Sequence, residues 1–216
     1  MARTAPALAD LYPRLATAVV HIAEAHRVAN PGTALCLIWG IRTPAEQQSA
    51  YAAGRTRIDG VKRHSLHAYG LAADLWVYTD AFGDCRLYEN RPPRDEGLRL
   101  ELLQRGSLKR WYIPMARLAE DIDPAIEAGA LWRTLKDGPH IQIGPLHERV
   151  RILQTLLESR GFDPGPVDGE CGPLTRAAME RAGCSCGIPW DVSRRQRRLM
   201  PCHPDLFRWL MAPRVS

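Results

Sequence analysis

The first part of the chain carries apolar patterns that change between helical and strand-like spacing. Over Leu8–His26 the apolar residues recur at steps of three and four, which predicts an amphipathic helix. The unbroken apolar run Ala34–Trp39 ends at Gly40 and predicts a buried strand. Thr43–Glu46 has Thr as the N-cap and Pro and Glu at the first and third helical positions, so a helix should begin there and run to about Ala53.

The middle of the chain predicts two more strands. Ala72–Tyr78 sends alternate side chains to opposite faces, and His140–Ile143 is a shorter strand of the same kind. A long loop is expected over Thr79–Arg94, where glycine, asparagine and proline recur, and helices are expected near Trp111–Glu120 and Pro124–Ala128. Strands separated by helices, with polar residues in the loops, predict an α+β domain.

The pattern changes after Gly144-Pro145. A helical stripe of apolar residues over Arg149–Gly161 is followed by tight turns rich in glycine and proline, and a second helix begins at Gly172. The remaining tail is rich in Cys, Arg and Trp and is expected to be helical near Asp205–Met211. The three parts expected are the α+β domain, a small helical C-terminal module and the tail: residues 1–145, 146–183 and 184–216.

Composition and charge narrow the choice of partners. The 216 residues have a formal net charge of +5, which favours an acidic partner such as nucleic acid, anionic lipid or bacterial cell wall. We expect no nucleic-acid partner, because no recognition motif occurs, and no transmembrane segment, because no apolar run approaches the ~20 residues of a membrane span. The start lacks the pattern of a signal peptide, so we expect cytoplasmic synthesis and six cysteines made as thiols. We also expect a monomer.

Two histidines and an aspartate supply the side chains that a catalytic zinc ion takes as ligands. Such a site uses three protein ligands and leaves a fourth position for water or substrate. His67 comes shortly before the strand that holds Asp74, and His140 opens another strand. If those strands are neighbours, their side chains can converge on one ion, and Gly70 permits the backbone to bend between His67 and Asp74. We therefore predict a Zn²⁺ site at His67, Asp74 and His140.

Two further residues have the chemistry that a zinc hydrolase needs. Asp137 lies three residues before His140, across the rigid Gly138-Pro139 turn, and is the predicted general base that moves a proton from water to the leaving amine. Arg42, at the end of the first strand, is the candidate for stabilising the oxyanion. The alternative is that Arg42 only forms an ion pair with Glu46.

Several separate motifs resemble those of the D-alanyl-D-alanine carboxypeptidase and phage L-alanyl-D-glutamate endopeptidase family, over roughly 8–143. In chain order they are Gly40–Gln47, Ala53–Thr56, Ser65–Asp74 and Asp137–Gln142. The resemblance implies a hedgehog-like α+β zinc peptidase fold and assigns the roles given above to the predicted ligands, to Asp137 and to Arg42. Ser65 matches the serine of the family's first zinc motif, which implies that it supports the site by hydrogen bonding.

The helical module resembles a second family. Its Gln154, Gly161-Phe162, Asp168-Gly169 and Thr175 are similar to the three-helix peptidoglycan-binding repeat found beside many cell-wall hydrolases. The two resemblances together imply an endolysin-like enzyme that is released from the cytoplasm and hydrolyses a stem-peptide bond of bacterial peptidoglycan, L-alanyl-D-glutamate. A D-alanyl-D-alanine carboxypeptidase remains open, because Ala130–Leu135 departs from the sequence that phage members carry there. A non-catalytic, zinc-containing wall-binding protein also remains open, because signalling relatives of this fold hold zinc as a structural ion.

The tail leaves two interpretations open. Cysteines in the tail and at the end of the module before it could form a second, structural zinc site with a histidine, although ordinary thiols are the simpler interpretation. The residues concerned are Cys171, Cys184, Cys186, Cys202 and His203. The run Arg194–Arg198 is typical of a solvated stretch, but beside a wall-binding module it could attract anionic wall polymer.

Overall fold

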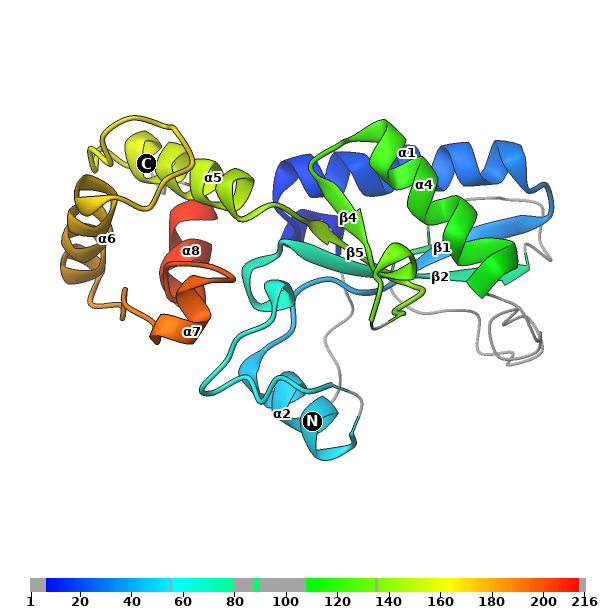
Figure 1. The fold of residues 1–216 in the computed structure, drawn as a ribbon, viewed down its shortest axis with the longest axis horizontal. Coiled ribbons are helices and arrows are strands. Elements are labelled where there is room, and N and C mark those ends of the chain that lie inside the picture. Colours follow the sequence, from blue (N-terminus) through cyan, green and yellow to red (C-terminus); the bar gives the residue numbers. More distant parts are fainter. Residues whose placement is uncertain (1–6, 55, 80–87, 90–107, 135, 214–216) are drawn as a thin grey trace. The chain divides into compact units, whose positions relative to one another are not determined.

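The computed structural model describes residues 7–54, 56–79, 88–89, 108–134 and 136–213 (Figure 1). The chain divides into two compact units, each made of two segments: Met1–Arg42 with Gly70–Ile143, and Thr43–Tyr69 with Gly144–Ser216. The first unit combines a sheet with helices and the second is helical, so the predicted α+β class and the helical C-terminal part are confirmed. In the described part of the chain, no helix combines the length and the apolar character that a membrane span requires.

The first unit is built on a sheet whose described strands follow the order β3-β1-β2-β5-β4. β1 (Thr33–Trp39), β2 (Ala72–Thr79) and β5 (His140–Ile143) confirm the three predicted strands. β1 pairs with β2, and β2 with β5, in antiparallel fashion. β3 (Tyr88–Glu89) pairs in parallel with β1, so the predicted loop was wrong at this point. Residues 80–87 and 90–94 of that loop lie outside the described residues.

The predicted helix over Pro124–Ala128 was also wrong, because this segment contains the edge strand β4 (Ile126–Ala128). Asp123 closes a turn, since its carbonyl oxygen accepts from the Ile126 N–H and its side chain accepts from the Ala125 N–H. Ile126 then pairs with Ile143 of β5, in antiparallel register. Five residues are too few to show a helical period, and pairing with β5 decides the conformation.

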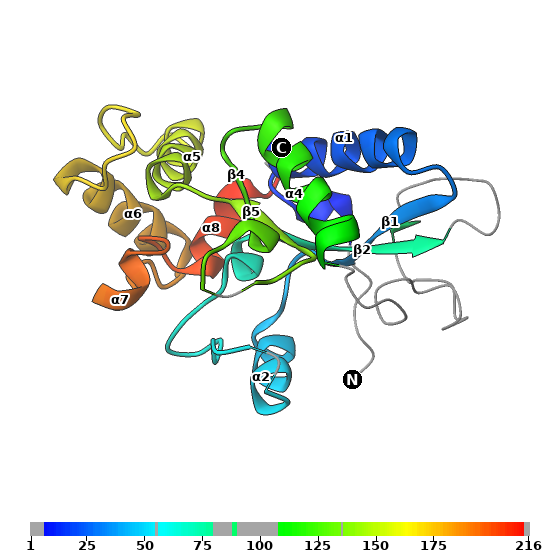
Figure 2. The same ribbon diagram turned by 45° about the vertical axis from the view of Figure 1, so that its right-hand side comes forward.

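Two helices of the first unit lie side by side over one face of its sheet (Figures 1 and 2). α1 (Pro13–Ala29) begins after a short 3₁₀ turn, η1 (Leu8–Asp10), so the predicted helix starts five residues later than expected. α4 (Ile113–Ile122) follows a π-helical turn, η4 (Leu108–Tyr112), and confirms the helix predicted there. The apolar stripe of α1 is buried as its spacing predicts, at Leu15, Val19 and Ile22.

The second unit contains only helices and turns among its described residues. In chain order its helices are α2 (Pro44–Ala52), the 3₁₀ turn η2 (Leu66–Tyr69), α5 (Leu146–Ser159), α6 (Pro173–Cys186), α7 (Arg194–Arg197) and α8 (Pro204–Met211). α2 begins as predicted: the Thr43 hydroxyl accepts from the Glu46 N–H, and the Glu46 carboxylate accepts from the Thr43 N–H. α8 confirms the helix expected near the end of the tail.

His26, near the C-terminal end of α1, couples the stability of the fold to pH. Its side chain is buried and Nε2 lies 3.0 Å from Thr33 Oγ1. Burial lowers the pKa of His26 from 6.5 to about 4. The unfolded chain therefore takes up this proton as the pH falls below 6.5, whereas the folded chain does so only near pH 4, and stability is lost across that window.

We expect His26→Gln, which can keep a hydrogen bond but cannot titrate, to lose less stability on acidification than the wild type. The difference between their free energies of unfolding should change by up to about 3 kcal/mol between pH 7 and pH 4. Urea unfolding at both pH values measures this difference. Parallel pH profiles for the two proteins would contradict a neutral, buried His26.

Candidate metal centre

Asp74 on β2 and His140 on β5 face each other directly. They are register partners in the antiparallel pair, as the predicted adjacency of the two strands requires. Asp74 Oδ1 lies 3.0 Å from His140 Nδ1, and the two residues are only 7% and 8% exposed. Ala72 and Ala73, the small residues before Asp74, are fully buried. The hydrogen-bonded register of the sheet thus sets the distance between these two side chains.

His67 lies in η2, just before the chain enters β2. Gly70 makes this entry possible because its φ of +70° lies in the left-handed region that favours glycine. His67 is 2% exposed. His67, Asp74 and His140 each offer one ligand atom, and these atoms lie within 4.8 Å of one another. The structure therefore brings the three predicted ligands together as a buried group that could hold a metal ion.

A second layer of side chains orients the His140 ring. His140 Nε2 lies 3.0 Å from Gln142 Oε1, and Gln142 Nε2 donates to Glu127 Oε2 at 3.2 Å. A proton on Nε2, donated to Gln142, makes Nδ1 the ring nitrogen that can bind a cation beside Asp74. Sequence reasoning missed Gln142 and Glu127. The signal available for Gln142 was its place two residues after His140, on the same face of a strand.

Asp74 also carries an ion pair with Arg42. Arg42 Nη2 donates to Asp74 Oδ2 at 2.5 Å, and the guanidinium lies 4.8 Å from the centre of the Trp39 ring. The acid that Arg42 contacts is thus a predicted metal ligand, whereas Glu46 is engaged at the N-terminus of α2. Burial alone would lower the pKa of His140, but its hydrogen bond with Asp74 and the charge of Asp74 raise it above the ordinary value. A metal ion would displace that proton.

Asp137 is half-buried and lies close enough to Asp74 and His140 for their charges to affect its pKa. Burial is the main cause that raises the pKa of the Asp137 carboxyl, and the negative charge of Asp74 raises it further. The backbone fixes its position: the Asp137 N–H donates to the Gly129 carbonyl, and the His140 N–H donates to the Asp137 carbonyl. A carboxyl group with a raised pKa is suited to both accepting and returning a proton.

Two glycines make room for the Asp137 segment. A Cβ on Gly138 would lie 2.8 Å from Cδ2 of the buried Tyr112 ring, and one on Gly129 would lie 2.4 Å from the Asp137 carbonyl oxygen. Neither φ is in the left-handed region, so close packing is what requires glycine at both positions. The turn that carries Asp137 and leads to His140 is therefore held by contact on both sides.

Ser65 takes part in the hydrogen bonding that precedes His67. Its hydroxyl, which is buried, donates to Gln47 Oε1 at 3.1 Å, and its carbonyl accepts from the Ala68 N–H. Trp132, from the segment in which the chain departs from the family pattern, lies beside the His140 ring with 5.2 Å between ring centres. Trp132 is therefore in contact with a predicted ligand, whereas Ser65 bonds to residues on either side of the chain position of His67.

The second zinc site considered for the tail does not form. Among the residues that the structure describes, the group at His67, Asp74 and His140 is the one set of three or more possible metal ligands. The five described cysteines are all free thiols. Cys202 is fully buried, whereas Cys184 is exposed, so these cysteines occupy different environments.

Comparisons with known proteins give a family match and a structural likeness. Residues 147–182 match the family described as "Putative peptidoglycan binding domain". This region holds most of α5 and α6, and Gln154 joins its turns by donating to Asp168 Oδ1 and Thr175 Oγ1 and accepting from the Gly169 N–H. The chain is also similar to the Serratia marcescens L-Ala D-Glu endopeptidase ChiX, with 20% identity and a TM-score of 0.42 over 63% of this chain and 82% of that chain. At this identity and score the likeness assigns neither fold nor activity.

We expect Gly138→Ala to destabilise the protein by about 1–3 kcal/mol, because its methyl group would overlap the buried Tyr112 ring. Gly172→Ala is the matched control, since a Cβ there meets nothing within 4 Å. Urea unfolding of both variants measures the difference. If Gly138→Ala is as stable as Gly172→Ala, the close contact with Tyr112 is not a constraint on the Asp137 turn.

Proposed function

We propose that the protein is a zinc-dependent peptidase that hydrolyses a stem-peptide bond of bacterial peptidoglycan, with the L-alanyl-D-glutamate bond as its target. One observation carries the proposal: three buried donor atoms lie within 4.8 Å of one another, close to a half-buried carboxyl group whose pKa is raised. The proposed endolysin-like role on the cell wall rests in addition on the peptidoglycan-binding match of residues 147–182.

The donor set fits zinc. Two neutral imidazoles and one carboxylate are a common ligand set of catalytic zinc, and they leave a fourth position for water or substrate. His67, Asp74 and His140 would hold the ion, and the Gln142 contact to His140 Nε2 is the kind of outer hydrogen bond that orients a ligating imidazole. When bound, zinc supplies a Lewis acid that polarises a carbonyl group and acidifies a water molecule.

Asp137 and Arg42 complete the chemistry. The Asp137 carboxylate would accept a proton from the attacking water and return it to the leaving amine, for which its raised pKa is suited. The Arg42 guanidinium would stabilise the developing oxyanion. In support, Arg42 Nη2 donates to Asp74 Oδ2, so its positive charge lies beside a proposed zinc ligand.

The choice of polymer rests on the second unit. Its residues 147–182 match a peptidoglycan-binding family, and the net charge of +5 suits an anionic wall. A wall-binding region joined to a peptidase site in one chain would keep that site close to its substrate. The structural likeness to ChiX adds nothing to this argument, because it is too weak.

We expect Asp137→Ala to lower the rate of hydrolysis of purified sacculi by about 10²–10⁴-fold, because proton transfer is lost, while zinc binding is retained. Asp121→Ala is the control, since Asp121 is exposed on α4. Mass spectrometry of the products identifies the bond: stem peptides that begin with D-glutamate support the proposal.

Other outcomes assign other functions. Release of D-alanine alone would identify a carboxypeptidase. Intact sacculi together with stoichiometric zinc would identify a wall-binding protein. Full activity after metal removal, or in Asp137→Ala, would contradict the proposed zinc chemistry or the proposed base.

A further inference from the structure

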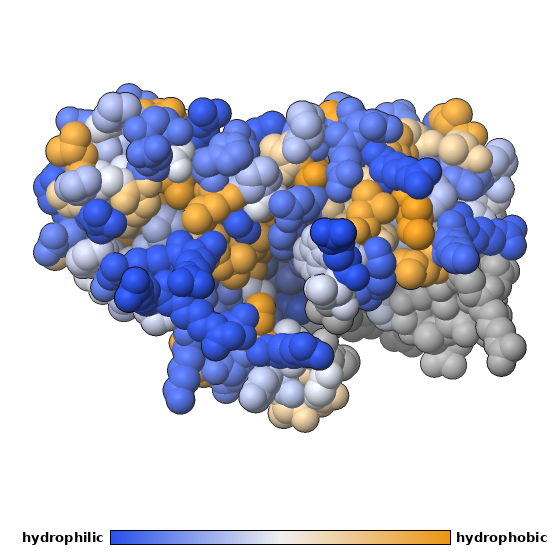
Figure 3. Space-filling view, viewed as in Figure 1, coloured by the Kyte–Doolittle hydropathy of each residue, from blue (hydrophilic) through white to orange (hydrophobic). Residues whose placement is uncertain are grey.

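The arginine run at residues 194–198 contains one buried side chain. Its four arginines are exposed, whereas Gln196 is only 3% exposed. Figure 3 shows hydrophilic side chains gathered over α7, which holds most of this run. A buried amide must find hydrogen-bond partners, because leaving it without them would cost about 1–3 kcal/mol. The partners of Gln196 therefore show what the run contributes to the second unit.

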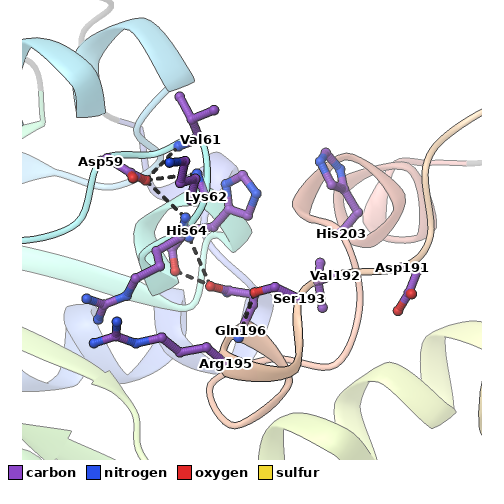
Figure 4. Close-up of a pocket in the computed structure, with 11 residues that line it drawn as sticks. Asp59, Val61, Lys62, His64, Asp191, Val192, Ser193, Arg195, Gln196 and His203 are labelled. Carbon is purple, nitrogen blue, oxygen red and sulfur yellow. Dashed lines mark hydrogen bonds between the residues drawn. The ribbon is translucent and has the colours of Figure 1, made fainter.

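Gln196 binds a segment that lies 132 residues earlier in the chain. Its Oε1 accepts from the His64 N–H at 3.0 Å, and its Nε2 donates to the His64 carbonyl at 3.1 Å (Figure 4). The amide thus occupies both backbone groups of one residue, as a neighbouring strand would. The bonds lie at the wall of a cavity of about 630 Å³ whose lining includes His64, Gln196 and His203.

The same amide reaches the other end of the turn that carries His67. Gln196 Nε2 lies 3.2 Å from Tyr69 Oη, and the Tyr69 hydroxyl donates to the Cys202 carbonyl at 2.8 Å. The Tyr69 ring is fully buried and meets Phe207 of α8 edge-on, with 5.7 Å between ring centres. Three residues of the tail therefore hold Tyr69.

A second buried amide holds the approach to this turn. Gln47 on α2 donates to the Ile58 carbonyl at 2.8 Å and accepts from the Ser65 hydroxyl at 3.1 Å. Asp59 Oδ1 accepts from three consecutive backbone N–H groups, those of Val61, Lys62 and Arg63, at 2.9–3.0 Å. These contacts hold the backbone before His64, and the hydrogen bonds of Gln196 hold it at His64 itself.

We infer that Gln196 is a positioning residue for His67. The inference rests on the proposed zinc function, because it treats His67 as a ligand. Gln196 anchors the chain at His64 and at Tyr69, so His67 lies between two fixed points. The tail after residue 183 accordingly helps to hold the proposed metal site, in addition to any role on the cell wall.

The physical effect is pre-organisation of one ligand. A ligand on a free turn must be ordered when the metal binds, and that ordering reduces affinity. Residues that orient ligands without touching the metal typically contribute 10–100-fold to metal affinity. Because Gln196 acts through the backbone, we expect the lower end of that range.

The test compares zinc affinities of full-length variants by competition with a chromogenic chelator. Gln196→Ala should bind zinc about tenfold more weakly than the wild type. Gln196→Glu should be weakened as well, because a carboxylate cannot donate to the His64 carbonyl or to Tyr69. Gln154→Ala is the matched control: Gln154 is equally buried in the same unit and binds a different loop, so its loss should lower the thermal unfolding temperature without changing zinc affinity.

The outcomes separate this inference from the proposed function. If Gln196→Ala does not fold, the zinc affinities of Gln196→Glu and Tyr69→Phe test the inference instead. Wild-type zinc affinity in those variants that fold would overturn the positioning role. So would an equal loss in Gln154→Ala, because it would show only a general loss of stability. If the wild type itself binds no zinc, or binds it equally well after His67→Ala, the proposed function fails instead.

Discussion

The pairing of Asp74 with His140 across two antiparallel strands is the constraint on which the candidate site depends. A shift of the register by one residue would turn one of these side chains to the other face of the sheet, so the site exists only in the observed pairing. The same register places Gln142 opposite Glu127 on β4, and this pair fixes the His140 ring. Two ligands and their support are thus properties of the sheet.

The third ligand has a different origin. His67 comes from a short turn that is followed by a left-handed glycine and preceded by a segment whose backbone is hydrogen-bonded by side-chain amides. Buried polar groups of this kind stabilise a structure only when each finds its partners, and Gln47 and Gln196 meet that condition through several hydrogen bonds each. The chain therefore combines two ligands set by strand pairing with one set by a network of hydrogen bonds.

Local patterns in the sequence predicted the elements that carry the site. The apolar runs gave β1, β2 and β5, the spacing gave α1, and the Thr43–Glu46 cap gave the start of α2. The candidate ligands were found because two histidines and an aspartate occur in or just before two of these strands, within motifs that resemble those of a zinc peptidase family. Each of these signals lies within a few residues of the feature that it predicts.

What the sequence did not predict depends on distant contacts. The strand conformation of Ile126–Ala128 arises from pairing with β5, and the role of Gln196 arises from a residue 132 positions away. Glutamine has no spacing pattern that marks it as a backbone partner, and among arginines it reads as one more solvated residue. The simpler interpretation of the tail cysteines as thiols holds for a related reason, since closeness in sequence did not gather them into a group of metal ligands among the described residues.

X-ray absorption at the zinc edge tests most directly whether His67, Asp74 and His140 hold the ion. The metal-free full-length protein would be loaded with one equivalent of zinc and compared with His140→Ala. The account predicts one tightly bound zinc, with two imidazole nitrogens and carboxylate oxygen at about 2.0–2.2 Å, and the loss of one imidazole in the variant. Sulfur ligands at about 2.3 Å, or a spectrum unchanged by His140→Ala, would contradict it.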